Sequence, residues 1–270
     1  MKLFKQTLLT AAIAFSTASA WAEDVTIAAA SDLKFALEDI KTAYVTAHPD
    51  DNVKITFGSS GKLSTQIEQG APFDLFFSAD IKYPKQLAAA KQAASEVKPY
   101  ALGRIVLWSN THDASQLTLE SLKEEQFKHI AIADPSHAPY GKRAEEALTA
   151  SKLWDTLKPK LVYGENIAQT AQFIESGNAD IGIIALALAL NPELSKQGGH
   201  YLIDDALHEP LEQAFILTTH GKDNTAAQRF AEYMQHPAAR KIMVKYGFVL
   251  PGEAADTIAT ADKTATTGAQ

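Results

Sequence analysis

Short runs of apolar residues alternate along the chain with longer segments in which apolar residues recur every third or fourth position. The first run, Val25–Ala30, lacks the in–out alternation of a half-exposed strand and is typical of a strand buried on both faces. Further strands are expected at Val53–Phe57, Phe73–Phe77, Gly103–Ser109, Ile130–Ala133, Leu161–Tyr163, Ile181–Ala185 and Leu211–Thr218.

The segments between these strands predict helices. One helical face in the first segment is marked by apolar residues at spacings of three and four, namely Leu33, Leu37, Ile40, Tyr44 and Ala47. Other helices are expected at about residues 60–70, 82–91, 142–150 and 166–177, and two more before Tyr246. Alternating strands and helices predict an α/β protein with mostly parallel sheets covered by helices, and 270 residues suffice for two sheets.

Both ends of the chain are expected to lie outside the fold. Residues 1–22 have the layout of a secretory signal peptide, with Lys2 and Lys5, a short apolar run and the small-x-small site Ala20-Trp21-Ala22. The apolar run is shorter than the ~20 residues that a membrane span needs. We therefore expect a periplasmic protein that does not span the membrane. Residues 251–270 are rich in Ala and Thr and are expected to form a disordered tail.

Composition narrows the possible functions. A net charge of −7 argues against nucleic acid as a partner. The chain contains no cysteine, which excludes thiolate metal sites and cysteine nucleophiles. Its eight histidines include no His-x-x-x-His pair. We therefore expect neither a bound cofactor nor a directly coordinated metal.

Four turns between predicted strands and helices carry the candidate chemistry. They are Ala30-Ser31-Asp32, Gly58-Ser59-Ser60-Gly61, Ala138-Pro139-Tyr140-Gly141 and Glu165-Asn166-Ile167. Ligands of open α/β sheets bind beyond the carboxyl ends of the strands, where such turns gather. Helix N-termini there offer unpaired N–H groups and partial positive charge, so an anion needs no Lys or Arg. Ser and Asn at helix starts are also ordinary caps, and the pattern alone leaves both interpretations open.

Enzymatic alternatives find little support in the motifs. Gly58 to Lys62 resembles a phosphate-binding P-loop only faintly, because that motif requires Gly at Thr56 and Ser or Thr at Leu63. A hydrolase that uses Ser60 or Asp74 lacks a general base at a recognisable spacing. We therefore expect no catalytic residue and no enzymatic activity.

Several stretches resemble the periplasmic molybdate-binding proteins of ABC importers, which have the type-II periplasmic binding fold. The resemblance covers about residues 24–250. It is carried by Ala28-Ala29-Ala30-Ser31-Asp32-Leu33, Phe57-Gly58-Ser59-Ser60-Gly61-Lys62-Leu63, Gly70-Ala71-Pro72-Phe73-Asp74-Leu75-Phe76-Phe77-Ser78-Ala79-Asp80, Asp134-Pro135 with Pro139-Tyr140-Gly141, and Lys245-Tyr246-Gly247-Phe248.

The resemblance implies two lobes with an anion in the cleft between them. Lobe I is expected at residues 23–109 and 208–250, and lobe II at residues 110–207. Ser31 and Ser60 would donate hydroxyl and N–H bonds, whereas Tyr140 and Ile167 would offer backbone N–H groups. These residues would contact molybdenum or tungsten only through the oxygens of the ion.

The implied partners are molybdate or tungstate and the membrane subunits of an ABC importer, with the chain itself a monomer. The alternative is a protein of the same fold for sulfate, phosphate or a small organic acid. Iron(III) capture would require several Tyr and acidic ligands, which Tyr140 alone does not supply.

Two residues depart from the family's pattern. Ala185 stands where many members have a tyrosine whose hydroxyl contacts the anion. We expect the Tyr140 phenol either to replace that hydroxyl or to act only as a cover, with a backbone bond. Asp32 lies next to Ser31 and is expected to turn away from the anion and serve the helix N-terminus.

Overall fold

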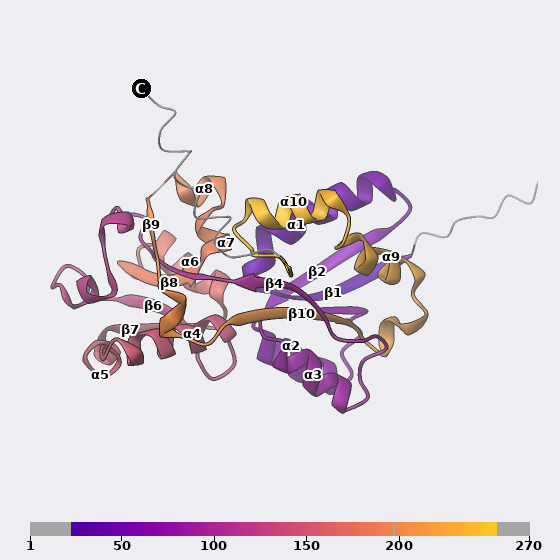
Figure 1. The fold of residues 1–270 in the computed structure, drawn as a ribbon, viewed down its shortest axis with the longest axis horizontal. Helices are drawn as coiled ribbons and strands as arrows, with labels where there is room; N and C mark the ends of the chain where they lie inside the picture. The colour runs from indigo at the N-terminus through magenta and orange to yellow at the C-terminus, as the bar shows by residue number, and fades with distance from the viewer. Residues whose placement is uncertain (1–22, 197, 253–270) are drawn as a thin grey trace, which may run out of the picture.

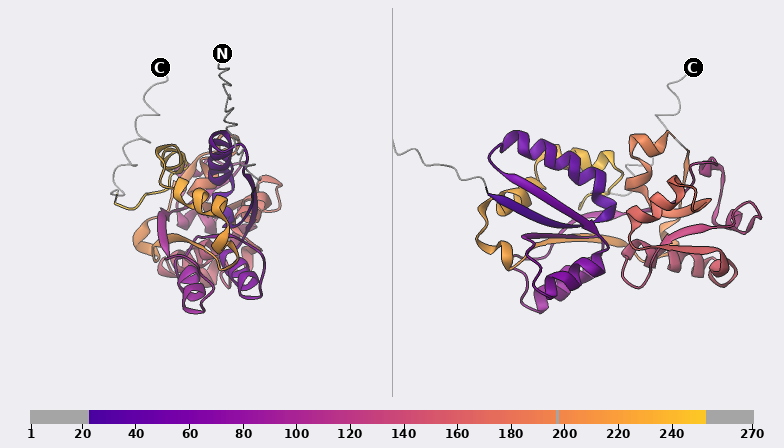
Figure 2. Two further views of the ribbon diagram at one scale, coloured as in Figure 1. Left: turned by 90° about the vertical axis from the view of Figure 1, so that its right-hand side faces the viewer. Right: turned by 180° about the vertical axis from the view of Figure 1, so that it is seen from behind.

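The computed structural model describes residues 23–196 and 198–252, which form two α/β lobes side by side along the long axis of the molecule (Figures 1 and 2). The predicted signal peptide, and the predicted tail from residue 253 onward, lie outside the described residues. Within the described part of the chain, no helix is long and apolar enough to cross a bilayer.

Each lobe contains one five-stranded sheet. The order of the first sheet is β2-β1-β3-β10-β4, and that of the second is β7-β6-β8-β5-β9. The pairings of β10 and β5 with their neighbours are antiparallel and the other pairings are parallel, so four of the five strands in each sheet share one direction. The expected mostly parallel sheets are therefore confirmed. The strands are β1 Asp24–Ala30, β2 Asn52–Gly58, β3 Leu75–Ser78, β4 Lys98–Gly103, β5 Ile105–Trp108, β6 Ile130–Ala133, β7 Leu161–Gly164, β8 Ile181–Ala185, β9 His200–Leu202 and β10 Leu211–Leu217.

Helices cover both sheets, as the alternating pattern predicts. Leu37, Ile40 and Tyr44 of α1 are buried, as is Leu33 just before it, but Ala47, at the end of the helix, is exposed. A short 3-10 helix at Ser31–Leu33 precedes α1. The α-helices are α1 Lys34–Ala47, α2 Ser60–Glu68, α3 Lys82–Ala89, α4 Pro139–Ala150, α5 Trp154–Leu157, α6 Ile167–Glu175, α7 Leu186–Ala189, α8 Pro192–Ser195, α9 Thr225–Tyr233 and α10 Pro237–Lys245.

The chain crosses between the sheets in two places. One crossing lies at Arg104, between β4 and β5, and the other lies between β9 and β10. The strand expected at Gly103–Ser109 is thus wrong in one respect: Gly103 ends a strand of the first sheet, and β5 pairs with β8 and β9 in the second. The apolar residues on both sides of Arg104 conceal this change of sheet. β5 therefore belongs with lobe II rather than lobe I, and the other lobe limits stay predictions.

Candidate functional site

A small cavity lies where the two lobes meet. All four residues proposed from the sequence, Ser31, Ser60, Tyr140 and Ile167, line it. The remaining lining residues are Ala30, Asp32, Gly58, Ser59, Ala79, Ala138 and Pro139. The lining includes no Lys, Arg or His, so positive charge at the cavity wall comes from the backbone.

Parallel strands aim four helix starts at this cavity. Ser31 follows β1, Ser60 follows β2, Tyr140 follows β6 and Ile167 follows β7, each just past the carboxyl end of its strand. First-turn N–H groups have no carbonyl partner within their own helix, and the helix dipole makes this end positive. Four such ends facing one small space favour a compact anion.

Ser60 lines the cavity, and its hydroxyl keeps a proton that it can donate. It is fully buried, and its Oγ accepts a hydrogen bond from the Ala79 N–H at 3.0 Å. A hydroxyl that accepts one bond still has its proton to donate. Ser60 does not cap α2, because Ser59 is the N-cap and Ser60 is the first helical residue.

Ser31 connects the two lobes. Its hydroxyl donates to Asn166 Oδ1 at 3.0 Å and accepts from the Ala168 N–H at 3.3 Å. Asn166 caps α6 as expected, with Oδ1 accepting from the N–H groups of Ala168 and Gln169. The hydroxyl of Ser31 therefore lies against the N-terminus of a lobe II helix, within reach of the same positive dipole.

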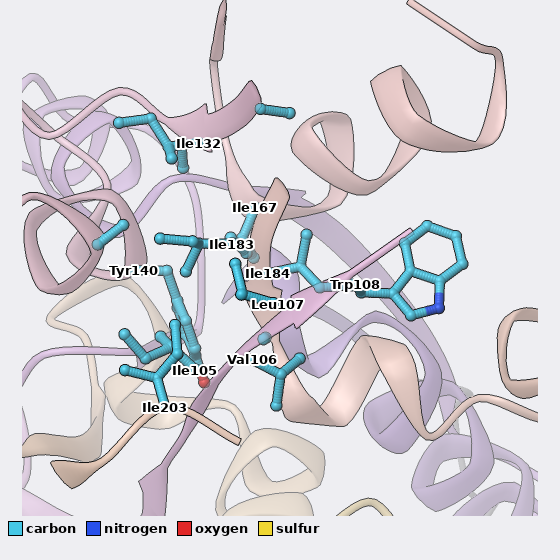
Figure 3. Close-up of a cluster of buried hydrophobic side chains, with 14 of the residues drawn as sticks. Ile105, Val106, Leu107, Trp108, Ile132, Tyr140, Ile167, Ile183, Ile184 and Ile203 are labelled. Atoms are coloured by element: carbon cyan, nitrogen blue, oxygen red, sulfur yellow. The ribbon is translucent and has the colours of Figure 1, made fainter. Parts of the chain in front are cut away.

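The Tyr140 phenol does not extend over the cavity as a free hydroxyl. Its ring is buried in the hydrophobic cluster of lobe II, and Figure 3 shows the hydroxyl end beside Ile105. The hydroxyl donates to Asp32 Oδ2 at 2.9 Å and accepts from Gln213 Nε2 at 3.0 Å. Tyr140 thus presents its first-turn backbone N–H to the cavity, whereas its hydroxyl is bonded to Asp32 and Gln213.

Asp32 turns its carboxylate toward Tyr140 and Gln213. Oδ2 accepts from both side chains, whereas Oδ1 is buried without a partner at hydrogen-bond geometry. Burial raises the pKa of Asp32 to about 6, against the lowering effect of the bonds from Gln213, Tyr140 and nearby backbone N–H groups. Because no cation lines the cavity, an ionised Asp32 is electrostatically unfavourable beside a bound anion.

Polar contacts close the rim of the cavity between the lobes. The Gly61 N–H donates to the His137 carbonyl at 3.0 Å, and Ser59 Oγ lies 3.0 Å from His137 Nδ1. Lys62 pairs with Glu165 at 3.2 Å. His137 therefore orders the loop before α4 through contacts with the other lobe.

Sequence reasoning missed some of the residues that shape the site. Gln213 comes from β10, about 180 positions from Asp32, and no local pattern signals their contact. Ser59 and Ala79 stood within motifs noted above without an assigned role. Ala185 is buried at the end of β8 and does not line the cavity. The described residues contain no group of three or more acidic or histidine side chains suited to a metal ion.

Comparison with known proteins agrees with this geometry. The model of the bacterial extracellular solute-binding protein family matches residues 25–249. The molybdate-binding protein ModA of Azotobacter vinelandii is 35% identical over 235 residues, which cover 86% of this chain and 92% of that protein. ModA of Rhodobacter capsulatus is 33% identical and covers 92% and 99% of the two chains.

Solved structures give the same result. The periplasmic molybdate-binding protein of Azotobacter vinelandii superposes with a TM-score of 0.79 at 31% identity, covering 84% of this chain and 99% of that one. The sulfate-binding protein SubI of Mycobacterium tuberculosis has a TM-score of 0.67 at 13% identity, which shows a shared fold alone. The resemblance stated from the motifs is confirmed, and the chain belongs to the bacterial extracellular solute-binding protein family.

Proposed function

We propose that this protein captures molybdate or tungstate and delivers it to an ABC importer. The observation that carries the proposal is the cavity between the lobes, where four helix N-termini converge and no cation intervenes. Molybdate-binding relatives that match nearly their whole length support the choice of ion.

The four proposed ligands have distinct roles. Ser60 donates its hydroxyl proton, which the bond from Ala79 leaves available. Tyr140 and Ile167 donate backbone N–H groups from the starts of α4 and α6. Ser31 donates its backbone N–H, and its hydroxyl exchanges Asn166 for the ion when the ion enters. Ligand capture is non-covalent, and we propose no catalysis.

Selection between oxyanions follows from size. Sulfate has the same shape and charge as molybdate but shorter bonds, so donors spaced for the larger ion miss some sulfate oxygens. Each missed charged hydrogen bond costs ~1.5–3 kcal/mol. Two missed bonds correspond to roughly 100-fold or more in affinity.

The alternative is a binding protein of the same fold for sulfate, phosphate or a small organic acid. The fold shared with a sulfate-binding protein makes sulfate the competitor to test first. An organic acid is disfavoured by the small size of the cavity.

Export and assembly complete the proposal. The family is extracellular, and we propose that residues 1–22 direct export to the periplasm and are then cleaved. We propose that the mature chain acts as a monomer, contacts the importer's membrane subunits and does not bind nucleic acid. Intact mass and light scattering of the exported protein test the cleavage site and the monomer.

Isothermal titration of the mature chain with molybdate, tungstate, sulfate and phosphate tests the function. We expect one molybdate or tungstate per chain and at least ~100-fold weaker sulfate. Sulfate or phosphate binding as tight as molybdate would replace the proposal with its alternative.

A further inference from the structure

Four buried polar side chains meet behind the anion cavity, at the junction of the two lobes. Asp32 belongs to the 3-10 helix after β1, and Tyr140 to α4 of lobe II. Tyr100 and Gln213 lie on β4 and β10, the first-lobe strands that lead to the two crossings. All four are at most 4% exposed.

Their hydrogen bonds form a chain with consistent donors and acceptors. The Tyr100 hydroxyl donates to Gln213 Oε1 at 2.6 Å, so the amide nitrogen of Gln213 must face the other way. That nitrogen donates to Asp32 Oδ2 at 2.8 Å and to the Tyr140 hydroxyl at 3.0 Å. The Tyr140 hydroxyl, having accepted, donates its own proton to Asp32. Asp32 is thus the acceptor for a donor that belongs to the opposite lobe.

The crossing segment packs directly against this chain. A Cβ added to Gly103 would lie 2.3 Å from the Tyr140 hydroxyl oxygen and 2.5 Å from Gln213 Nε2. Gly103 is the last residue of β4, immediately before the crossing at Arg104. The Tyr140 hydroxyl, which lobe II carries, and Asp32, which lobe I carries, therefore meet beside this crossing.

The same two turns carry the proposed ligands. Ser31 precedes Asp32 in the chain. Tyr140 carries the proposed backbone N–H ligand and also donates its hydroxyl proton to Asp32. The bond between the two side chains therefore fixes how far the lobe II donor lies from the lobe I donors across the cavity.

We propose that Asp32 and Gln213 are positioning residues that form an interlobe latch on the Tyr140 hydroxyl, which holds the lobes closed around the ion. The proposal deepens the proposed function and rests on it for the identity of the ion. In this account the Tyr140 hydroxyl is a latch and not an anion ligand, and it slows the release of the ion.

Dissociation and association rates of molybdate, measured by stopped flow, test the latch. Tyr140→Phe deletes only the latch hydroxyl, and we expect it to raise the dissociation rate ~10- to 150-fold. Association should change little, because the ion first meets the open lobes. Asp32→Ala should have a similar effect, and the double variant should be no worse than either single variant. Tyr163→Phe, which alters a 43%-exposed tyrosine of lobe II, is the matched control.

Asp32→Asn separates the latch from a loss of folding. Its amide oxygen still accepts from Tyr140, so we expect dissociation no faster than in the parent. A direct anion role for the Tyr140 hydroxyl predicts a different pattern. Asp32→Ala would then free that hydroxyl and remove a negative charge, so release would be slower than in the parent. That result would overturn the latch, as would a parental dissociation rate in Tyr140→Phe.

A ligand-free arm keeps the latch distinct from the identity of the ion. The chain has no cysteine, so Asp50→Cys and Glu125→Cys, at exposed positions in the two lobes, give a unique pair of labels. Single-molecule energy transfer should show Tyr140→Phe lowering the closed fraction about tenfold or more relative to the parent and Tyr163→Phe. If molybdate leaves the closed fraction of the parent unchanged, the proposed function is refuted and the latch is not. In that case, equal closed fractions in the parent and Tyr140→Phe refute the latch.

Discussion

Replacement of Ser60 by alanine separates a ligand role from a structural one. Ser60 is fully buried at the start of α2, and its hydroxyl connects the Ala79 N–H to the cavity. Ser60→Ala therefore removes two interactions at once. One is the acceptor of a backbone bond within lobe I, and the other is the proposed donor to the ion.

The two losses appear in different measurements. A buried N–H left without its acceptor costs ~1–3 kcal/mol of folding stability, which denaturant unfolding of the ligand-free protein would detect. The lost charged donor costs ~1.5–3 kcal/mol of binding, or roughly 10- to 150-fold in the dissociation constant from calorimetry. Because Ser59 is the N-cap, loss of a helix cap does not contribute.

Ser64→Ala is the matched control. Ser64 lies on the same helix and is 3% exposed, but it does not line the cavity. We expect parental affinity in this variant. If Ser60→Ala lowers the unfolding free energy and leaves the affinity unchanged, Ser60 is a structural residue and its assignment as a ligand is wrong.

Three further predictions concern closure, charge and the crossing. Donors from both lobes must reach one ion, so small-angle scattering should show a smaller radius of gyration with molybdate, and an unchanged radius would argue for a site within one lobe. Burial raises the pKa of Asp32 from 3.8 to about 6, so the closed protein binds a proton more readily than the unfolded chain and loses stability as pH rises across that window. Asp32→Asn should therefore gain up to about 3 kcal/mol over the parent at about pH 8 and nothing below about pH 4, and a pH-independent difference in unfolding free energy would contradict this. Gly103→Ala inserts a methyl group where the Tyr140 hydroxyl and Gln213 amide lie, so molybdate release should accelerate as in Tyr140→Phe, and a parental rate would show that the crossing tolerates displacement.

The sequence predicted strands best where they are buried on both faces. β1, β6 and β8 are interior strands with mostly apolar runs, and their predicted bounds agree closely with the structure. β4 and β9 were missed, and each is the edge strand of its sheet. β4 contains Pro99, which an edge strand tolerates, and β9 spans only three residues, so neither has a strong periodic signal.

The candidate site was predictable to the extent that it is local. Ser31, Ser60, Tyr140 and Ile167 each follow a strand and begin a helix, and that arrangement can be recognised from short motifs. The direction of the Tyr140 phenol was not predictable, because it depends on Asp32 and Gln213, which are distant in the sequence. Alternation of apolar residues carries no information about such long-range polar contacts.

The central claim is that one oxyanion occupies the cavity between the lobes. A crystal structure of the mature chain with molybdate, with anomalous data collected at the molybdenum edge, locates the metal directly. We predict one peak per chain in the cavity, with its oxygens at hydrogen-bond distance, about 2.7–3.2 Å, from donors of Ser31, Ser60, Tyr140 and Ile167. A peak elsewhere, or an ion that contacts only one lobe, would contradict the account.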